Sequence, residues 1–364
     1  MIPHSQNTKL LPSDTRRHNR SLVLRTLYGA SDISRADVAR ITSLSRITSS
    51  ELVNGLVEDG LVYEVGARDS SGRPGKPATL LRINPRAFNV VGVDLSDPQR
   101  LTTALVSIDG DTLHQSVLPG ELRGDAAFSA IVNAVATLKG KSTAPLSAIA
   151  IGTPGVVNEE GTVVEANNLD WRSFPLARRV RERFDVPTLV YNDANAAIMA
   201  EHDAGAGANL ILVRIGIGLG AACLINGELV LGANFASGEL GQLRIDDRGG
   251  ARLESVVRTL IEDALAALSR GDDDAARKAQ TEIGALLGRS LAPVISVLDV
   301  PELVIDARAG LDAAVIGDSV SREIKQHLAL DSRRTLEIRG SSFGEGAVIR
   351  GVVARAIAHS LDWA

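Results

Sequence analysis

Apolar residues in the first sixty positions recur at helical spacing and are interrupted by helix caps. Residues 16–29 place four apolar side chains within two turns and end at a glycine, which predicts one helix. Ser34, with an acidic residue three positions later, can cap a second short helix that runs to about Ile41, and Ser45 can cap a third that ends at Gly60. Two helices joined by a three-residue connection are typical of a helix-turn-helix unit.

The next segment, residues 61–85, alternates apolar and polar positions around a turn and predicts a two-stranded wing with the tip sequence GRPGKP. The third helix begins with short polar side chains, which would let its backbone enter a major groove, while the cations of the wing tip could follow a groove or the phosphates. The expected DNA contacts are Ser45, Arg46, Thr48, Ser49, Ser50, Arg73 and Lys76. Two alternatives stay open: the helix pair can be a purely structural hairpin, and the wing can be an interaction hairpin with an incidental charge pair.

Beyond residue 87, patterns of alternating strands and helices replace the helical head. Residues 90–110 and 210–232 each predict a strand, a turn and a second strand. Buried strands that open into a loop or a helix are expected at 148–158 and 187–201, and helices at 252–268 and about 275–297 precede another apolar strand at 302–307. A hairpin that opens each half predicts duplicated α/β lobes with a cleft between them.

These patterns predict four parts: a disordered polar tail at 1–13, a winged helix-turn-helix domain at 14–86, a first lobe at 87–197 and a second lobe at 198–364, whose C-terminal helix is a candidate to return to the first lobe. A length of 364 residues agrees with two or three domains.

The net charge also differs between the head and the body. Residues 14–86 carry twelve Lys or Arg and eight Asp or Glu; with Lys9 counted, the total of −5 leaves −10 for residues 87–364. A basic head on an acidic body suits a nucleic-acid module joined to a body with another task.

The composition, 45% apolar and 23% charged, is that of a soluble globular protein. The most apolar stretch, residues 210–225, is too short to span a bilayer and contains Arg214, and the first twenty residues show no signal peptide, so a cytoplasmic protein without membrane contact is expected. The single Cys223 excludes an internal disulfide framework, and the six histidines show no metal-ligand spacing.

Seven segments together resemble one family. In the head these are SRADVARITSLSRITSS and GRPGKPATLL; in the body they are IGTPGVVN, NNLDW, YNDANAA, GIGLGAACLINGELVLG and GELGQL. The chain resembles the ROK family of repressors, open reading frames and sugar kinases from about residue 16 to its end. The resemblance implies an α/β fold in which a winged helix-turn-helix precedes a two-lobed, actin-like and ribonuclease-H-like body of the sugar-kinase type. In this family, a winged-helix head marks the regulators.

The resemblance also implies roles for individual residues. Asp193 occupies the position of the general base that accepts a sugar hydroxyl proton in the family's kinases. The other positions at which the family holds sugar hydroxyls are Gly155, Asn168, Asn192, Glu239 and Glu254. Carboxylates and carboxamides suit a sugar ring, which offers alternating hydrogen-bond donors and acceptors. By itself, the Asn192–Asp193 pair has a second interpretation, because Asn and Asp after a strand commonly cap the next helix.

Several departures from the family pattern concern the nucleotide and the metal. Where the family's kinases have Asp-x-Gly-Gly-Thr for phosphate binding, this chain has Asp94-Leu95-Ser96-Asp97. Ile217 replaces the Thr of a Gly-Thr-Gly loop, and residues 304–308 lack the paired glycines of the adenosine segment. Gln242 replaces the zinc-binding histidine, with no cysteines after it, so no zinc site is expected, whereas Gln242 can still bond a sugar hydroxyl.

We therefore expect a sugar-responsive transcriptional regulator, a repressor, that needs no cofactor and no metal and in which Asp193 is a vestigial catalytic base. The expected partners are operator DNA with two half-sites, a sugar or sugar-phosphate effector, and further copies of the chain in a homodimer or tetramer. Two alternatives remain: an active sugar kinase with a regulatory head, and a ligand-independent DNA-binding module whose body only oligomerises.

Overall fold

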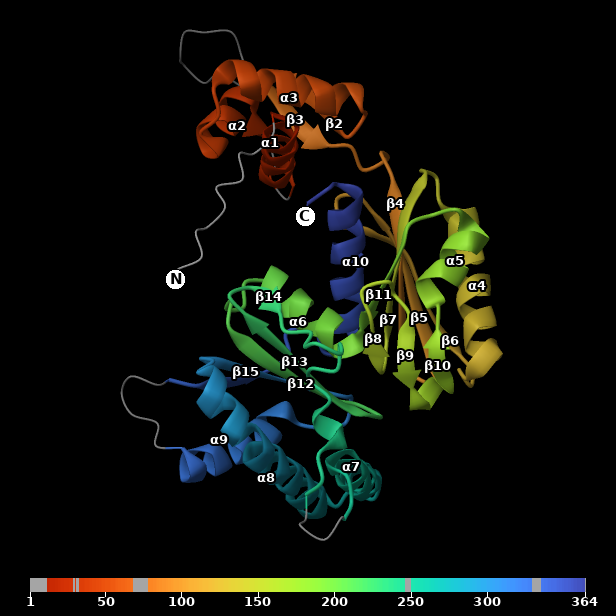
Figure 1. Ribbon diagram of the computed structural model, residues 1–364, viewed down its shortest axis with the longest axis vertical. Coiled ribbons are helices and arrows are strands. Elements are labelled where there is room, and N and C mark those ends of the chain that lie inside the picture. Colours follow the sequence, from red (N-terminus) through yellow and green to blue (C-terminus); the bar gives the residue numbers. More distant parts are fainter. Residues whose placement is uncertain are drawn as a thin grey trace, which may run out of the picture.

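The computed structural model describes residues 12–28, 30, 33–67, 78–245, 250–328 and 335–363. A helical head lies at one end of the molecule above two lobes that face each other (Figure 1). Arg73 and Lys76 of the expected wing tip lie outside the described residues. Helix α1 (Pro12–Leu27) begins inside the segment expected to be a disordered tail, so that expectation was wrong for residues 12 and 13. A proline fits the first turn of a helix, where its missing N–H needs no partner.

The head is a winged helix-turn-helix. Helix α2 (Arg35–Thr42) begins with a capping box between Ser34 and Asp37, and helix α3 (Arg46–Glu58) begins with Ser45, whose side chain accepts from the N–H of Thr48. Strands β1 (Ile33–Ser34), β2 (Val62–Ala67) and β3 (Thr79–Ile83) form a sheet in the order β1-β3-β2. The predicted caps and the three-residue connection between α2 and α3 are thus confirmed.

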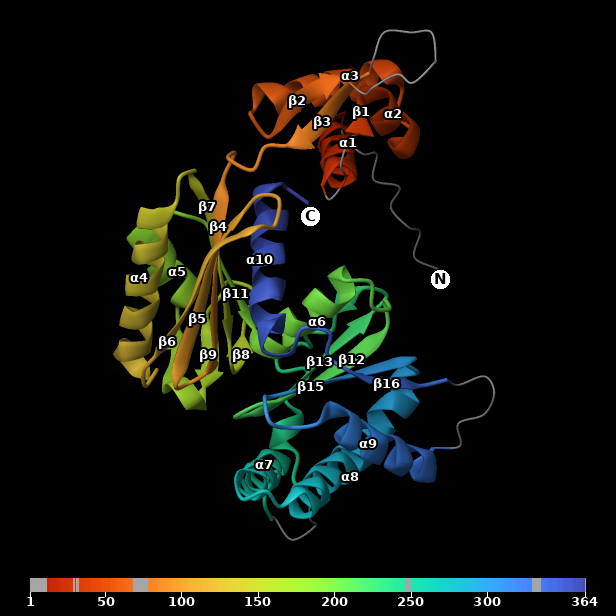
Figure 2. The same ribbon diagram turned by 180° about the vertical axis from the view of Figure 1, so that it is seen from behind.

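The first lobe contains a five-stranded sheet in the order β11-β7-β4-β5-β6. Its strands are β4 (Asn89–Asp97), β5 (Arg100–Ser107), β6 (Thr112–Pro119), β7 (Leu146–Thr153) and β11 (Thr188–Asn192). Strands β4, β7 and β11 are parallel, and β5 and β6 extend them as antiparallel strands. Helices α4 (Gly124–Lys141) and α5 (Leu176–Phe184) cover one face (Figure 2). A small sheet of β8 (Val156–Val157), β9 (Val163–Ala166) and β10 (Trp171–Phe174) lies at the cleft end.

The second lobe repeats this arrangement, with the order β16-β15-β12-β13-β14. Its strands are β12 (Leu210–Ile215), β13 (Leu219–Ile225), β14 (Glu228–Leu229), β15 (Glu302–Ala307) and β16 (Glu337–Gly340). Again a hairpin extends three parallel strands. Helices α7 (Leu253–Ser269), α8 (Asp273–Leu298) and α9 (Ala313–His327) pack on the face made by Ile211, Val213 and Ile215. The predicted duplication of α/β lobes is confirmed.

Helix α8 is, among the described residues, the one helix that could cross a membrane by length and composition. It packs against α7 and α9, and Ile283, Leu287 and Leu291 are buried in the core of the second lobe. These contacts are those of a core helix in a globular lobe.

Two helices lie between the lobes. Helix α6 (Asp193–Asp203) follows β11 directly, and α10 (Ala347–Ser360) packs on β4 and β7 of the first lobe. The two helices approach closely at Gly351, where a Cβ atom would lie 1.9 Å from the carbonyl oxygen of Ala196. Glycine is therefore required there by the backbone of the neighbouring helix. The chain thus returns to the first lobe after completing the second.

The far end of α10 meets the head. Trp363 packs edge to face on Tyr28, with ring centroids 4.8 Å apart, and the Trp363 carbonyl accepts from Arg25 at 3.1 Å. Arg17 of α1 is paired with Asp362. The last helix therefore connects the body to the winged helix-turn-helix head (Figure 1).

Candidate functional site: the cleft between the lobes

A cavity of about 820 Å³ opens between the lobes, at the carboxyl ends of strands β4, β7, β11, β12 and β15. Strand ends of parallel sheets are where α/β proteins place ligands, because loops and helix N-termini converge there. The structure brings all of the residues expected to face a sugar to this cavity: Gly155, Asn168, Asn192, Asp193, Glu239, Gln242 and Glu254.

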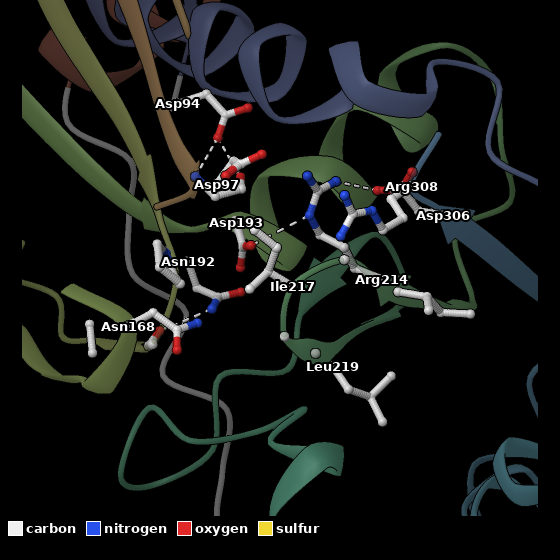
Figure 3. A pocket seen from close by; sticks show the side chains of 18 of the residues that line it. Asp94, Asp97, Asn168, Asn192, Asp193, Arg214, Ile217, Leu219, Asp306 and Arg308 are labelled. Atoms are coloured by element: carbon white, nitrogen blue, oxygen red, sulfur yellow. Dashed lines mark hydrogen bonds and ion pairs between the residues drawn. The ribbon is translucent and has the colours of Figure 1, made fainter. Parts of the chain in front are cut away.

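Asn192 and Asp193 occupy different roles at the start of α6. Asn192 caps the helix, since its Oδ1 accepts from the N–H of Asn195 at 3.1 Å, and its Nδ2 donates to the carbonyl of Gly155 at 2.9 Å. The capping interpretation therefore holds for Asn192. Asp193 is the first residue of the helix, and its Oδ1 accepts from the N–H of Ala194 at 2.9 Å. Its Oδ2 pairs with the Nε of Arg214 at 3.4 Å, and Asp193 lines the cavity (Figure 3).

Glycine is required at position 155 by the backbone of the loop after β7, which lines the cavity. Its φ is +89°, and a Cβ atom there would lie 2.1 Å from the carbonyl oxygen of Glu165. The carbonyl of Gly155 is fixed in turn by Asn192. A β-carbon would therefore displace strand β9 and the loop that presents the neighbouring polar groups.

The second lobe contributes carboxylates opposite this loop. Glu254 lies in the first turn of α7, and a Cβ atom at Gly218 would lie 3.1 Å from its Oε1 and 3.8 Å from the Nδ2 of Asn168. Asn168 and Glu254 thus converge from opposite lobes on one glycine. Glu239 hydrogen-bonds the side chain of Gln242, and burial raises the pKa of Glu239, with Asp193 and Glu254 adding to the effect.

The β4–β5 turn, on the other side of the cavity, satisfies its own polar groups. Asp94 is buried and accepts from the N–H of Ser96 at 2.8 Å as well as from its hydroxyl. Asp97 accepts from the N–H of Gln99 at 2.9 Å and pairs with Arg100 at 3.0 Å. Two backbone N–H groups of the turn are therefore occupied by the turn's own carboxylates.

Arg214 lies at the centre of the cleft (Figure 3) and was not expected as a site residue. It is paired with Asp306 and, at 3.4 Å, with Asp193. Burial raises the pKa of Asp193 to about 6; Arg214 opposes this rise, while Asp94 adds to it. The signal in the sequence was an arginine inside an otherwise apolar strand, but its partners lie on other elements.

No metal centre is formed by the described residues. Within the described ranges, no three His, Cys, Asp or Glu side chains are placed to hold an ion. The loop that resembles the family's zinc segment, residues 239–254, contains no cysteine and no histidine. The residues present therefore do not fit a tetrahedral zinc ion.

The helix surface expected to face DNA differs from the expectation in one residue. Ser45 and Arg46 are exposed and Thr48 and Ser50 are half-buried, but Ser49 is 1% exposed. Position 49 lies one helical turn before the buried Leu52 and Val53 and two turns before the buried Leu56, so its side chain points into the head. Ser49 is therefore wrong as a side-chain contact to DNA.

Sequence reasoning also missed Ile47. It is 73% exposed in the first turn of α3, beside Arg46. An isolated exposed apolar residue is common on any surface, but an apolar side chain at this point of a recognition helix could contact a thymine methyl group.

The duplicated lobes, the cleft at their strand ends and the helix that returns across them define a two-lobed, actin-like protein with a winged helix-turn-helix head. Residues 90–254 match the model of the ROK family, and the chain therefore carries a ROK family domain.

Three relatives illustrate the similarity. The chain is 26% identical over 373 residues to a xylose repressor of Bacillus spizizenii, covering 94% of this chain and 96% of that protein. A ROK family transcriptional regulator described as a homologue of the Escherichia coli MLC protein superposes with a TM-score of 0.77, 22% identity, and coverage of 95% and 96%. A ROK glucokinase of Streptomyces griseus, solved with glucose and AMPPNP, gives a TM-score of 0.63 and 22% identity, covering 73% of this chain and 98% of that one.

Proposed function

We propose that this protein is a sugar-responsive transcriptional regulator, a repressor, whose cleft binds a sugar without phosphorylating it. The similarity to the xylose repressor includes the head and the body, whereas the glucokinase spans 73% of this chain. A DNA-binding head on a sugar-kinase-type body is the architecture of a regulator that senses a sugar. We place its action in the cytoplasm, on operator DNA.

The observation that carries the sensor interpretation is that backbone N–H groups of the β4–β5 turn are occupied by the turn's own carboxylates. A phosphate-binding turn needs free backbone N–H groups that converge on the anion. Here the carboxylates of Asp94 and Asp97 accept from the N–H groups of Ser96 and Gln99. The same carboxylates would repel a triphosphate. This turn therefore opposes nucleotide binding both by occupying its own donors and by its charge.

A route from the cleft to the head runs along α10. Glu345 and Ile349 at its start line the cavity, and Arg100 of the β4–β5 turn pairs with Glu345 at 3.0 Å. At the other end, Trp363 contacts Tyr28 of α1. A sugar that changes the closure of the lobes would change the position of α10 and hence the spacing of two heads in a homodimer or tetramer.

The test uses the full chain and DNA selected by it from a random pool. Operator binding is titrated with hexoses, pentoses, N-acetylhexosamines and their phosphates, and we expect at least one uncharged sugar to change the operator Kd. A shift requires that the sugar bind the two conformations with different affinity. If no selected sequence is enriched, or if no sugar at millimolar concentration changes the Kd, the proposal is wrong.

Two matched variants connect this assay to the head. Arg46→Ala should weaken operator binding, because Arg46 is exposed at the start of α3, and losing a contact to DNA typically costs about 1–3 kcal/mol. Ser49→Ala should leave the Kd unchanged, because this side chain is buried. The reverse pattern would contradict the placement of α3 against DNA.

A residual sugar kinase is the second candidate, and Asp193 favours it. With a pKa of about 6, this carboxylate is ionised at neutral pH and can accept a hydroxyl proton. A coupled ATP-turnover assay over the same sugars distinguishes the two functions. Sugar-dependent turnover that Asp193→Asn abolishes would establish the kinase and overturn the sensor.

A further inference from the structure

Arg214 occupies the face of β12 that turns toward the cleft. On this strand, Ile211, Val213 and Ile215 pack in the core of the second lobe, whereas Leu210 and Leu212 pack on the opposite face. Arg214 continues the face of the two leucines at the strand end, where packing gives way to the cavity. Its side chain is only 16% exposed, so the strand has placed a charged group at a nearly buried position.

Two carboxylates pair with this guanidinium and a third interacts with it electrostatically, each from a different element. Asp306 is Arg214's register neighbour on the parallel strand β15 and is paired with it. Asp193 at the start of α6 lies 3.4 Å away, and Asp94 at the end of β4 interacts with Arg214 electrostatically. A buried arginine is stabilised only when carboxylates offset its lost hydration, and a planar guanidinium can serve more than one carboxylate at once.

We propose that Arg214 is a built-in counter-ion for effector recognition: it pairs with both Asp193 and Asp306 and positions Asp193 as an ionised acceptor for a hydroxyl of an uncharged sugar. The inference rests on the proposed function, since it assigns the effector class of the same cleft. Arg214 acts through Asp193 and is therefore a positioning residue.

The charge balance of the cleft determines which ligands it accepts. Arg214 is already paired with Asp306 and Asp193, and Asp94 adds a third negative charge nearby. An anionic group at this end would lose its hydration and meet excess carboxylate charge. A neutral polyol avoids this repulsion and can donate a hydroxyl hydrogen to Asp193. Sugars should therefore bind more tightly than the same sugars phosphorylated at this end.

The first test needs no ligand. The charged groups that face Asp193 are Arg214 on β12, Asp94 on β4, Asp306 on β15 and Glu239 before η2 (Leu240–Gln242). The pKa of Asp193 lies above its ordinary value of 3.8, so the folded state binds a proton more tightly than the unfolded state. Stability is thus lost as the pH rises from about 4 through 6.

Arg214→Gln removes the cation that opposes this rise, so the pKa values of Asp193 and Asp306 should move further upward. The Tm deficit of the variant relative to the unmodified protein should then be small at pH 5 and grow by several degrees toward pH 8. Adding Asp193→Asn should flatten this growth. Arg289→Gln, which breaks an ion pair with Glu323 of the same 3.4 Å length, should give a pH-independent deficit. A deficit of Arg214→Gln that does not depend on pH would overturn the proposal.

The second test measures sugar affinity with the uncharged sugar that stabilises the unmodified protein most. Arg214→Gln should weaken sugar binding roughly 10-fold or more at pH 7. Sugar affinity falls as the pH is lowered and Asp193 is protonated, and in Arg214→Gln the midpoint of this fall should move to higher pH, whereas Arg214→Lys should restore the midpoint. An unchanged pH profile in Arg214→Gln, or tighter binding of the phosphorylated sugar, refutes the proposal. If no sugar binds the unmodified protein, the proposed function fails, and the pH dependence of Tm still decides whether Arg214 is the counter-ion.

Discussion

The side of the cleft that contains the start of α6 and the side that contains the β4–β5 turn are built alike, but their polar groups are used differently. Each is formed where strands end, and each presents carboxylates or amides to the cavity. On the α6 side, the side chains of Asn168 and Glu254 have no hydrogen bond or ion pair to the described residues, whereas Asp193, which also lines the cavity, pairs with Arg214 at 3.4 Å. On the β4–β5 side, Asp94 and Asp97 are bound to the backbone of their own turn.

Hydrogen-bonding capacity, and not polarity, therefore distinguishes the two sides. A polar group recognises a ligand only if its donors or acceptors are not already used inside the protein. On the α6 side, Asn168 and Glu254 have this capacity, while the β4–β5 side uses it for its own turn and for the Arg100–Glu345 pair that leads to α10. One cleft can thus have unpaired polar side chains on one side and structural contacts on the other.

The largest expected effect is that of Gly155→Ala on the α6 side. The new Cβ atom would lie 2.1 Å from the Glu165 carbonyl oxygen at a φ of +89°. We expect the free energy of unfolding to fall by about 3–5 kcal/mol. We also expect sugar binding to be lost. Denaturant unfolding measures the loss. Gly205→Ala is the control, since Gly205 has a φ of +104° but open space around it, so strain alone should cost about 1 kcal/mol.

Asp193→Asn should cost less stability but most of the sugar affinity. The carboxamide keeps the shape of the side chain but loses the charged acceptor. We expect the binding free energy to weaken by about 2–3 kcal/mol, which raises Kd roughly 30- to 150-fold. Calorimetric titration with a sugar identified by melting shift measures this.

Asp97→Asn provides the comparison across the cleft. Because Asp97 is bound to Gln99 and Arg100, its change should alter the sugar Kd by no more than a factor of about two to three. Equal losses for Asp193→Asn and Asp97→Asn would remove the distinction between the two sides.

A smaller effect is expected for Arg100→Gln, which breaks the connection between the turn and α10. The pair with Glu345 is partly exposed, so we expect a loss of about 0.5–1 kcal/mol in stability and near-normal sugar affinity, but a weaker effect of sugar on operator binding. In a double-mutant cycle, Glu345→Gln should add little to Arg100→Gln. Full additivity of the two changes would show that the pair does not carry the coupling.

The sequence predicted the features that depend on nearby residues. The capping box of α2, the cap at Ser45 and the hairpin that opens each lobe are set by residues a few positions apart, and local patterns are sufficient for them. The burial of Ser49 could also have been found locally, because it is three positions before Leu52 on one face of α3.

The role of Arg214 was not predictable in this way. Its partners lie 21 positions before it, at Asp193, and 92 positions after it, at Asp306, so only the paired strands and the start of α6 bring them together. The contact of Trp363 with Tyr28 is likewise set by the return of α10. The identity of the nearby groups then determines the pKa of Asp193, which no local pattern contains.

The smallest expected effect is that of Ile217→Thr, which restores the hydroxyl that the sequence lacks in the β12–β13 turn. The N–H of Gly216 already donates to the carbonyl of Gly218 at 3.0 Å, and the opposite turn still has its N–H groups occupied by Asp94 and Asp97. A single hydroxyl cannot replace those donors, so we expect no binding of a non-hydrolysable ATP analogue by calorimetry. A Kd below about 1 mM for this variant would mean that the missing hydroxyl alone prevents nucleotide binding, and that the occupied N–H groups of the β4–β5 turn do not oppose it.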